Sequence, residues 1–201
     1  MKIVLASNNQ GKLRELQAMF APLDCTLLCQ GDLAVPECPE PYRTFVENAL
    51  AKARNAAQHT GLPALADDAG LCVDAFGGLP GVDTAYYATQ FGYSKGDDNN
   101  VKALLQQMQS LTNRRAALVS TLVALRSPQD PEPLIAVGRV VGEIAPAPMG
   151  DHGFGFDPVM WIPQFGQTFA QLPEAVKNAH SHRGQAASQM LALMRANWLA
   201  S

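Results

Sequence analysis

Short runs of β-forming residues alternate in this chain with segments whose apolar residues recur at helical spacing. Residues 3–5 read Ile-Val-Leu, and apolar residues follow at intervals of three and four over residues 13–20, which is the period of a helix. Residues 116–125 and 134–144 are again β-rich and are separated by a Ser-Pro-Gln-Asp-Pro turn. Helices mixed with strands that can pair in both directions predict an α/β or α+β fold built on a mixed sheet.

Length and composition exclude several classes of protein. With 201 residues, 47% of them hydrophobic, the chain can bury the core of one domain or of one compact two-lobed unit, which excludes disorder. Neither an internal repeat nor a long linker interrupts the sequence, so residues 1–201 are predicted to form a single domain. A formal net charge of −3 provides no broad basic surface for a nucleic acid polymer.

The apolar pattern and the cysteines predict a cytoplasmic protein. The apolar run at residues 3–6 is too short for the core of a signal peptide, and no stretch approaches the roughly 18 apolar residues that cross a membrane. The four cysteines, Cys25, Cys29, Cys38 and Cys72, form no C-x-x-C pair. We therefore expect buried reduced thiols, and neither a zinc site nor disulfides.

Helix boundaries can be predicted at several positions. Thr44 and Glu47 have the spacing of a capping box, and an alanine-rich helix that ends at Gly61 is expected to follow. Residues 97–100 read Asp-Asp-Asn-Asn and are expected to cap a third helix. The apolar pattern of residues 173–201 predicts helical structure up to the end of the chain.

A polar turn between the first strand and the first helix could hold a phosphate. It comprises Ser7, Asn8, Asn9, Gln10, Gly11 and Lys12. A helix N-terminus offers unpaired N–H donors and the positive end of the helix dipole, and Lys12 adds a cation. The turn fails the Walker A pattern, because Ala6 replaces its first glycine and Leu13 its magnesium-binding Ser or Thr. A capped helix with a solvated lysine explains the same residues equally well.

Two adjacent carboxylates, Asp67 and Asp68, follow a short apolar run at what the pattern predicts to be a strand end. Oxygen ligands of this kind suit Mg²⁺, which binds one or two carboxylates together with substrate phosphates, and Glu40 could join the same site. Adjacent residues of an extended backbone point to opposite faces, so one carboxylate could hold the metal or activate water while the other has a structural role. Alternatively, residues 67–70 form only a turn.

Two later segments carry groups that could recognise a nucleobase. Residues 153–158 read Gly-Phe-Gly-Phe-Asp-Pro, where glycines allow a ligand to approach the backbone, an aromatic ring can stack on a base and an aspartate can accept from ring N–H groups. Lys177 and the Ser-His-Arg-Gly sequence at 181–184 supply donors. Loop packing and an N-cap at Ser181 would account for the same residues.

Taken together, these segments resemble the motifs of the inosine/xanthosine triphosphate pyrophosphatase family, over nearly the whole chain. The motifs are [ST]-x-N-x-x-K at 7–12, F-x-E-N-A-x-x-K-A at 45–53, A-D-D-[SA]-G-L at 66–71, G-F-G-[YF]-D-P at 153–158 and K-x-x-x-S-H-R-G at 177–184. Each motif is weak by itself. All of them in this order leave little room for coincidence.

The resemblance implies a fold and an activity. The fold would be α/β, an elongated mixed β-sheet flanked by helices, with two lobes and the active cleft between them. The activity would be Mg²⁺-dependent hydrolysis of ITP, dITP and XTP between the α- and β-phosphates, which releases the monophosphate and pyrophosphate. A homodimer is also implied, with a purine nucleoside triphosphate as its partner and neither a nucleic acid polymer nor a membrane.

Roles for individual residues are implied as well. Asp68 would activate the attacking water and, together with Glu40, hold the metal. The residues that would bind substrate are Ser7, Asn8, Asn9, Gln10, Gly11, Lys12, Lys52, Ala69, Phe154, Gly155, Phe156, Asp157, Lys177, His182 and Arg183. Donors at His182 and Arg183 would pair with the 6-oxo group of inosine or xanthosine. The 6-amino group of adenosine would leave them unpaired, which costs about 1 to 3 kcal/mol for each buried group.

The sequence departs from the family pattern at two positions. Ala69 stands where serine is common, and Tyr86 stands where the family commonly reads A-R-Y. We expect these changes to alter rate or base preference without abolishing activity. Two other functions stay open: a P-loop-like NTPase, which Leu13 argues against, and a non-catalytic purine nucleotide sensor, which the retained Asp68 and Glu40 argue against.

Overall fold

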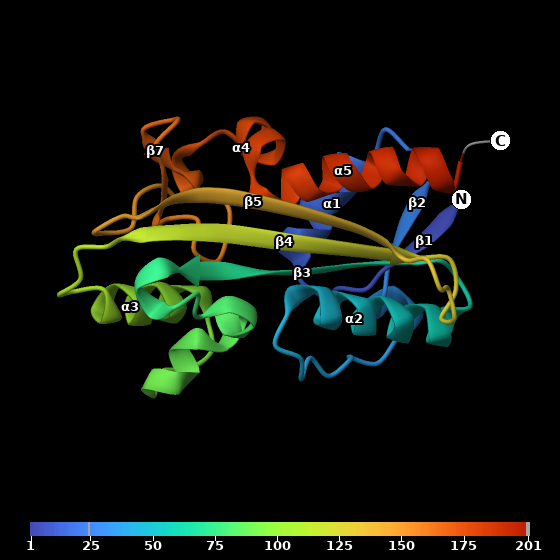
Figure 1. Cartoon of the computed structure of the whole chain (residues 1–201), viewed down its shortest axis with the longest axis horizontal. Helices are drawn as coiled ribbons and strands as arrows, with labels where there is room; N and C mark the ends of the chain where they lie inside the picture. The colour runs from blue at the N-terminus through green and yellow to red at the C-terminus, as the bar shows by residue number, and fades with distance from the viewer. Residues whose placement is uncertain (24, 200–201) are drawn as a thin grey trace. The chain divides into compact units, whose positions relative to one another are not determined.

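The computed structural model describes residues 1–23 and 25–199. The strands are β1 (Lys2–Leu5), β2 (Thr26–Cys29), β3 (Ala64–Val73), β4 (Arg115–Leu125), β5 (Leu134–Ile144), β6 (Met160–Ile162) and β7 (Gln167–Thr168). The α-helices are α1 (Gln10–Phe20), α2 (Phe45–Thr60), α3 (Asp97–Gln107), α4 (Glu174–His180) and α5 (His182–Asn197) (Figure 1). In the described part of the chain, no helix has the length and apolarity needed to cross a membrane.

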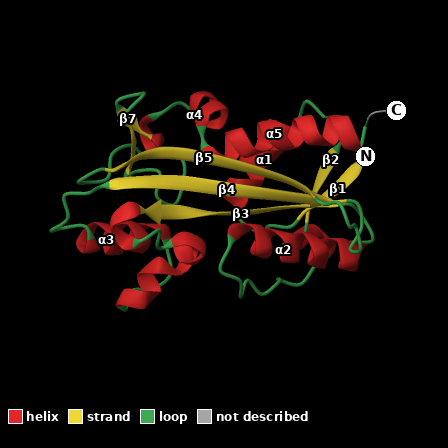
Figure 2. Ribbon diagram, viewed as in Figure 1, coloured by secondary structure: helices red, strands yellow, loops and turns green. Residues whose placement is uncertain are grey.

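The described strands form one open sheet of mixed direction (Figure 2). They pair in the order β2-β1-β3-β4-β5-β6-β7. β1 pairs in parallel with β2 and with β3, with Ile3 opposite Leu27 and Val4 opposite Ala64. β6 pairs antiparallel with β5 and β7. The predicted mixed sheet flanked by helices is therefore confirmed.

The chain divides into two compact units. Unit 1 comprises Met1–Asp68, Ser120–Gly138 and the chain from His182 onward. Unit 2 comprises Ala69–Val119 and Arg139–Ser181. The strands β3, β4 and β5 each contribute residues to both units. That the units act as two lobes of one domain stays a prediction.

Unit 1 has a hydrophobic core on each face of its strands. Ile3 and Leu5 of β1 pack with residues of α1 and α5, whereas Val4 packs with α2. This alternation follows from the two-residue period of a strand. In β3, Leu65 belongs to the first core and Ala66 to the second. The position of a residue along β3 therefore decides which helices its side chain meets.

Unit 2 has a single core in which α3 packs beside a 3₁₀ segment, Gly81–Phe91. Leu104 and Met108 are fully buried there, and Phe156 and Phe169 reach the same core from the second half of the unit. The burial of Phe156 ties the Gly-Phe-Gly-Phe-Asp-Pro loop to the body of this unit.

The predicted second helix is confirmed at both ends. The Thr44 hydroxyl accepts from the N–H of Glu47 at the start of α2. Gly61 ends the helix with a φ of +66°, a left-handed conformation that glycine adopts without strain.

Three local predictions are wrong. β3 runs without interruption from Ala64 to Val73, so Asp67 and Asp68 lie inside a strand and neither follow its end nor form a turn. The Asp-Asn stretch at 97–100 forms the first turn of α3, with Gly96 at the N-cap and no side-chain cap. The four cysteines are half-buried instead of buried, in part because Cys29 lies on β2 at the edge of the sheet.

Candidate active site

Four charged side chains in unit 1 form what we call the buried ion network: Lys12, Glu15, Asp67 and Arg183. Arg183 Nε lies 3.0 Å from Asp67 Oδ2, and Lys12 Nζ lies 3.2 Å from the same oxygen. Glu15 Oε2 accepts from Arg183 Nη1 at 2.6 Å. Ser120 adds a neutral donor, since its hydroxyl lies 2.7 Å from Asp67 Oδ1. Two carboxylates thus balance two cations in a region largely closed to solvent.

A second cluster lies beside Asp68. Lys52 Nζ, from α2, is 3.1 Å from Asp68 Oδ1 and 2.8 Å from Glu40 Oε2. Asp67 and Asp68 are adjacent on an extended strand and so point to opposite faces. Asp67 contacts Lys12 of α1 and Arg183 of α5. Asp68 contacts Lys52 of α2. The expectation that the two carboxylates face different surroundings is confirmed.

The two carboxylates also differ in their affinity for protons. Burial raises the pKa of Asp67, but the charges of Arg183 and Lys12 outweigh burial and hold that pKa well below its usual range. Burial raises the pKa of Asp68 above its usual value, although Lys52 and Lys12 oppose the change. Asp67 is therefore fixed as an anion, whereas Asp68 is the better proton acceptor of the two.

The two lysines respond in opposite directions to their surroundings. Burial lowers the pKa of Lys12, and the nearby Asp67 offsets only part of that effect. Burial also acts to lower the pKa of Lys52, but Asp68 and Glu40 outweigh it and raise that pKa. Lys52 is consequently a firmly charged cation between two carboxylates.

The turn before α1 is ordered by its own side chains. Asn9 is the N-cap, and its Oδ1 accepts from the N–H of Lys12 at 3.0 Å. Ser7 Oγ accepts from the N–H of Asn9 at 3.2 Å. The side chain of Lys12 extends to Asp67, so the alternative of a solvated lysine is wrong.

The rest of this turn faces outward. Asn8 is exposed, and its Nδ2 donates to Glu37 Oε1 at 3.3 Å. Gln10 and Gly11 are the first two residues of α1, where an α-helix leaves backbone N–H groups without intrahelical partners. Such N–H groups can bind an anion.

Asp68 and Glu40 have the chemistry of a magnesium site that substrate would complete. Within residues 1–23 and 25–199, no three His, Cys, Asp or Glu side chains gather into a metal-binding group. Asp68 Oδ2, however, is buried without a hydrogen-bond partner, and the Glu40 side chain is 43% exposed. Since Mg²⁺ typically takes one or two carboxylates plus phosphates and water, these two residues fit that cation.

In unit 2, the Gly-Phe-Gly-Phe-Asp-Pro loop surrounds a buried ion pair. Lys177 Nζ lies 2.6 Å from Asp157 Oδ2 and 5.0 Å from the centroid of the Phe154 ring. The N–H of Phe154 donates to the same Asp157 oxygen at 2.9 Å. Gly153 has a φ of +78°, and a Cβ there would collide with the Asp157 carboxylate. Glycine at this position is therefore required by both conformation and space.

The remaining predicted site residues lie in different environments. Phe156 is 3% exposed within the core of unit 2. Ala69 is half-buried on β3, and His182 is buried at the start of α5. Of the residues predicted to recognise the base, Phe154, Asp157 and Lys177 belong to unit 2, whereas His182 and Arg183 belong to unit 1.

Sequence reasoning missed Glu15 and Ser120. Both carried a signal, because each is a polar residue within an apolar pattern. Glu15 precedes Leu16 on the buried part of α1, and Ser120 interrupts the apolar run of β4. Buried polar groups are nearly always hydrogen-bonded, so each position predicts a partner without saying which one.

The sequence is similar to known proteins over nearly its whole length. The family model described as Ham1 family matches residues 3–193. A protein of Albidiferax ferrireducens named dITP/XTP pyrophosphatase is 78% identical over 199 residues, which cover 99% of this chain and 100% of that protein. A protein of Paracidovorax citrulli with the same name is 75% identical over 198 residues, covering 98% of this chain and all of the relative.

Solved structures extend the similarity to the fold. A HAM1 protein from Coxiella burnetii has a TM-score of 0.90 and 40% sequence identity, covering 98% of this chain and 99% of that one. The Ham1 protein of Staphylococcus aureus has a TM-score of 0.85 and 34% identity at the same coverage. The family relationship expected from the ordered motifs is confirmed: this chain belongs to the Ham1 family.

Proposed function

We propose that this protein hydrolyses ITP, dITP and XTP between the α- and β-phosphates, releasing the nucleoside monophosphate and pyrophosphate. The observation that carries the proposal is its full-length identity of 78% and 75% to two proteins named dITP/XTP pyrophosphatase. The clusters around Asp67 and Asp68 support it, because phosphoryl transfer depends on positioning and charge neutralisation.

The triphosphate would bind to the cations and helix N-terminus of unit 1. Lys52 and Lys12 carry the positive charge, and the segment Ser7, Asn8, Asn9, Gln10 and Gly11 supplies backbone N–H groups and side-chain donors. Because Lys52 is held between Glu40 and Asp68, phosphate binding would draw these carboxylates and the substrate to one place.

Asp68 would act as the general base. Its raised pKa and its buried, unpartnered Oδ2 suit a group that accepts the proton of the attacking water. The water oxygen would bond to the α-phosphorus, the α–β bridge would break, and pyrophosphate would leave. Asp68 and Glu40 would hold Mg²⁺, which when bound neutralises phosphate charge and polarises the reacting phosphate. Asp67, held by Arg183 and Lys12, would keep this part of β3 rigid.

The base would be recognised by residues of the loop and of α5. Phe154 is half-buried and could stack on a purine, with Gly155, Phe156 and Ala69 shaping its surroundings, while Asp157 and Lys177 provide fixed polar groups. His182 and Arg183 would donate to a 6-oxo group. Glu15 and Asp67 orient the guanidinium of Arg183, so its geometry is set before a nucleotide binds.

The test is to incubate the purified protein with ITP and Mg²⁺ and to identify the products by anion-exchange chromatography. Equal amounts of IMP and pyrophosphate are expected, and EDTA should stop their release. Single phosphate released from ATP or GTP would instead support a P-loop-like NTPase. Tight ITP binding without products would support a nucleotide sensor. Initial rates on ITP, XTP, GTP and ATP would rank the substrates.

We further propose that the protein is a cytoplasmic homodimer, as the family resemblance implies. Size-exclusion chromatography with light scattering should give about twice the 21.5 kDa mass of the chain. A mass of one chain at micromolar concentration would refute the dimer, and fractionation of cells that express the tagged protein would test its location.

A further inference from the structure

The loop at residues 153–157 is held by two carboxylates that come from different places in the sequence. Asp157, within the loop, accepts from the N–H of Phe154 at 2.9 Å. Asp97, at the start of α3, accepts from the N–H of the next residue, Gly155, at 2.8 Å. Two successive N–H groups are therefore bound by two different carboxylates, both within unit 2.

The position of Asp97 favours this contact over local capping. Asp97 is the first residue of α3, and the helix has no side-chain cap at Gly96. An aspartate at a helix start ordinarily stabilises its own helix, through N–H groups or the dipole. Here the carboxylate also accepts from the N–H of a residue 58 positions later in the chain.

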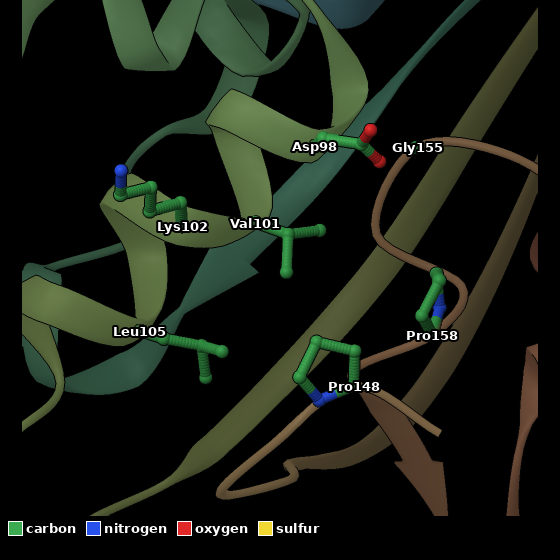
Figure 3. Close-up of a pocket in the computed structure, with 7 residues that line it drawn as sticks. All are labelled: Asp98, Val101, Lys102, Leu105, Pro148, Gly155 and Pro158. Carbon is green, nitrogen blue, oxygen red and sulfur yellow. The ribbon is translucent and has the colours of Figure 1, made fainter. Parts of the chain in front are cut away.

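Packing alone does not set the position of the loop next to α3. A cavity of about 430 Å³ lies between them, lined by Asp98, Val101, Lys102, Leu105, Pro148, Gly155 and Pro158. Figure 3 shows Gly155 and Pro158 on the loop across this space from Val101 and Leu105 of α3. Beyond the cavity, Phe156 anchors the loop in the core. The hydrogen bond from Gly155 to Asp97 therefore joins the loop directly to the start of α3 beside this cavity.

Gly155 has no side chain to pack, so at this residue the loop depends on the hydrogen bond to Asp97. Its φ is +63°, and a Cβ there would meet no atom within 4 Å. Its neighbour Phe154 is half-buried and lies over Lys177. A shift of the Gly155 peptide would move the adjoining Phe154 ring relative to the Lys177–Asp157 pair.

We propose that Asp97 is a positioning residue for base selection: it fixes the peptide at Gly155 and thereby the placement of Phe154 against the Asp157–Lys177 pair. The inference rests on the proposed function, since it names how that site selects its base. In the proposed function other residues hold the phosphates and the attacking water, and Asp97 takes part in neither task. Its loss should weaken discrimination among bases more than it weakens the binding of phosphates.

The test compares Asp97→Ala with Asp98→Ala. Both residues are exposed aspartates in the first turn of α3, so both variants lose the same helix-dipole stabilisation. Only Asp97 bonds to the loop. For Asp97→Ala we expect kcat/KM on ITP to fall about tenfold, as for the loss of one charge-assisted hydrogen bond, mainly through KM, with a smaller fall on GTP. Asp98→Ala should behave as wild type.

Two further measurements separate positioning from general destabilisation. Inorganic tripolyphosphate, which has no base, should inhibit ITP hydrolysis by Asp97→Ala with an unchanged inhibition constant. Asp97→Asn keeps an oxygen acceptor and should restore part of the ITP-to-GTP ratio. Thermal melting should show that both variants are fully folded at the assay temperature.

The outcomes distinguish this inference from the proposed function. A wild-type protein that yields no IMP and pyrophosphate overturns both, because there is then no base selection to position. If the wild type is active, an unchanged ITP-to-GTP ratio in Asp97→Ala overturns the role of Asp97 and leaves the function standing. An equal loss in Asp98→Ala, or weaker tripolyphosphate inhibition, would also overturn it.

Discussion

Replacement of Glu15 by Gln should destabilise the protein strongly, because it removes one charge from the buried ion network. Glu15 Oε2 lies 2.6 Å from Arg183 Nη1, and the side chains of Glu15 and Arg183 are 8% and 3% exposed. Removing one partner of a buried pair costs about 3–5 kcal/mol. Arg183 keeps Asp67 at 3.0 Å and the new amide offers an oxygen, so we expect the lower end, about 3 kcal/mol.

Urea unfolding at pH 7, followed by circular dichroism, measures this loss directly. In a separate thermal melt, the midpoint temperature should fall by about 6–12 °C, because in a chain of this length each kcal/mol shifts it by about 2–4 °C. The matched control is Glu143→Gln, which makes the same chemical change at an exposed position of β5. That variant should stay within about 0.5 kcal/mol of wild type.

Unfolding measured at high salt concentration can refute the reasoning about the Glu15–Arg183 pair. A buried pair is screened weakly, so the difference between wild type and Glu15→Gln should persist in 1 M NaCl, where the Debye length is about 3 Å. A loss no larger than that of Glu143→Gln, or one that vanishes in high salt, would show that the Glu15–Arg183 pair behaves as a surface contact. The reasoning from burial would then be incorrect.

Asp68→Asn should abolish ITP turnover while nucleotide binding, measured by calorimetry, is kept; near-normal turnover would remove Asp68 as the base. Gly153→Ala should lower stability more than Gly155→Ala, because of the two only a Cβ at Gly153 would collide with the Asp157 carboxylate. Gly155→Ala should cost only backbone strain, about 1–2 kcal/mol. Equal melting midpoints for the two variants would contradict this. A hydrogen bond from the N–H of Arg126 is the main cause that holds the pKa of Asp130 below its usual value. The stabilisation is therefore present above the unfolded-state pKa of about 3.9 and is lost as the pH falls through the lower pKa of the folded state. The stability gap between wild type and Asp130→Asn should therefore narrow from pH 6 to pH 3, and a constant gap would refute it.

Much of the fold could be predicted where local chemistry decides it. The helix from Thr44 to Gly61 follows from a cap, an alanine-rich face and a glycine stop, which are all local signals. The run through Asp67 and Asp68 could not be predicted, because two charged residues in a buried strand are tolerated only when distant cations neutralise them. Those cations come from α1, α2 and α5, and nothing near residue 67 in the sequence names them.

The candidate site shows the same division. The sequence assigned Asp68 and Glu40 to the metal and Lys52 to the substrate, and the structure places all three in contact through the Lys52 ammonium. Glu15 and Ser120 escaped notice, although each stood in an apolar pattern. Their partners lie 168 and 53 residues away, so their roles depend on packing.

By itself, the sequence determined the class of fold, the family and the residue types available for phosphate and base recognition. It did so because periodicity, caps and ordered motifs are properties of short segments. Only the tertiary structure decided that the pKa of Asp67 lies well below its usual range, among two cations and a second carboxylate, while the pKa of Asp68 is raised. The reason is physical: adjacent carboxylates on a strand are chemically identical in sequence, and they diverge only when the two faces of β3 meet different cations and different degrees of burial.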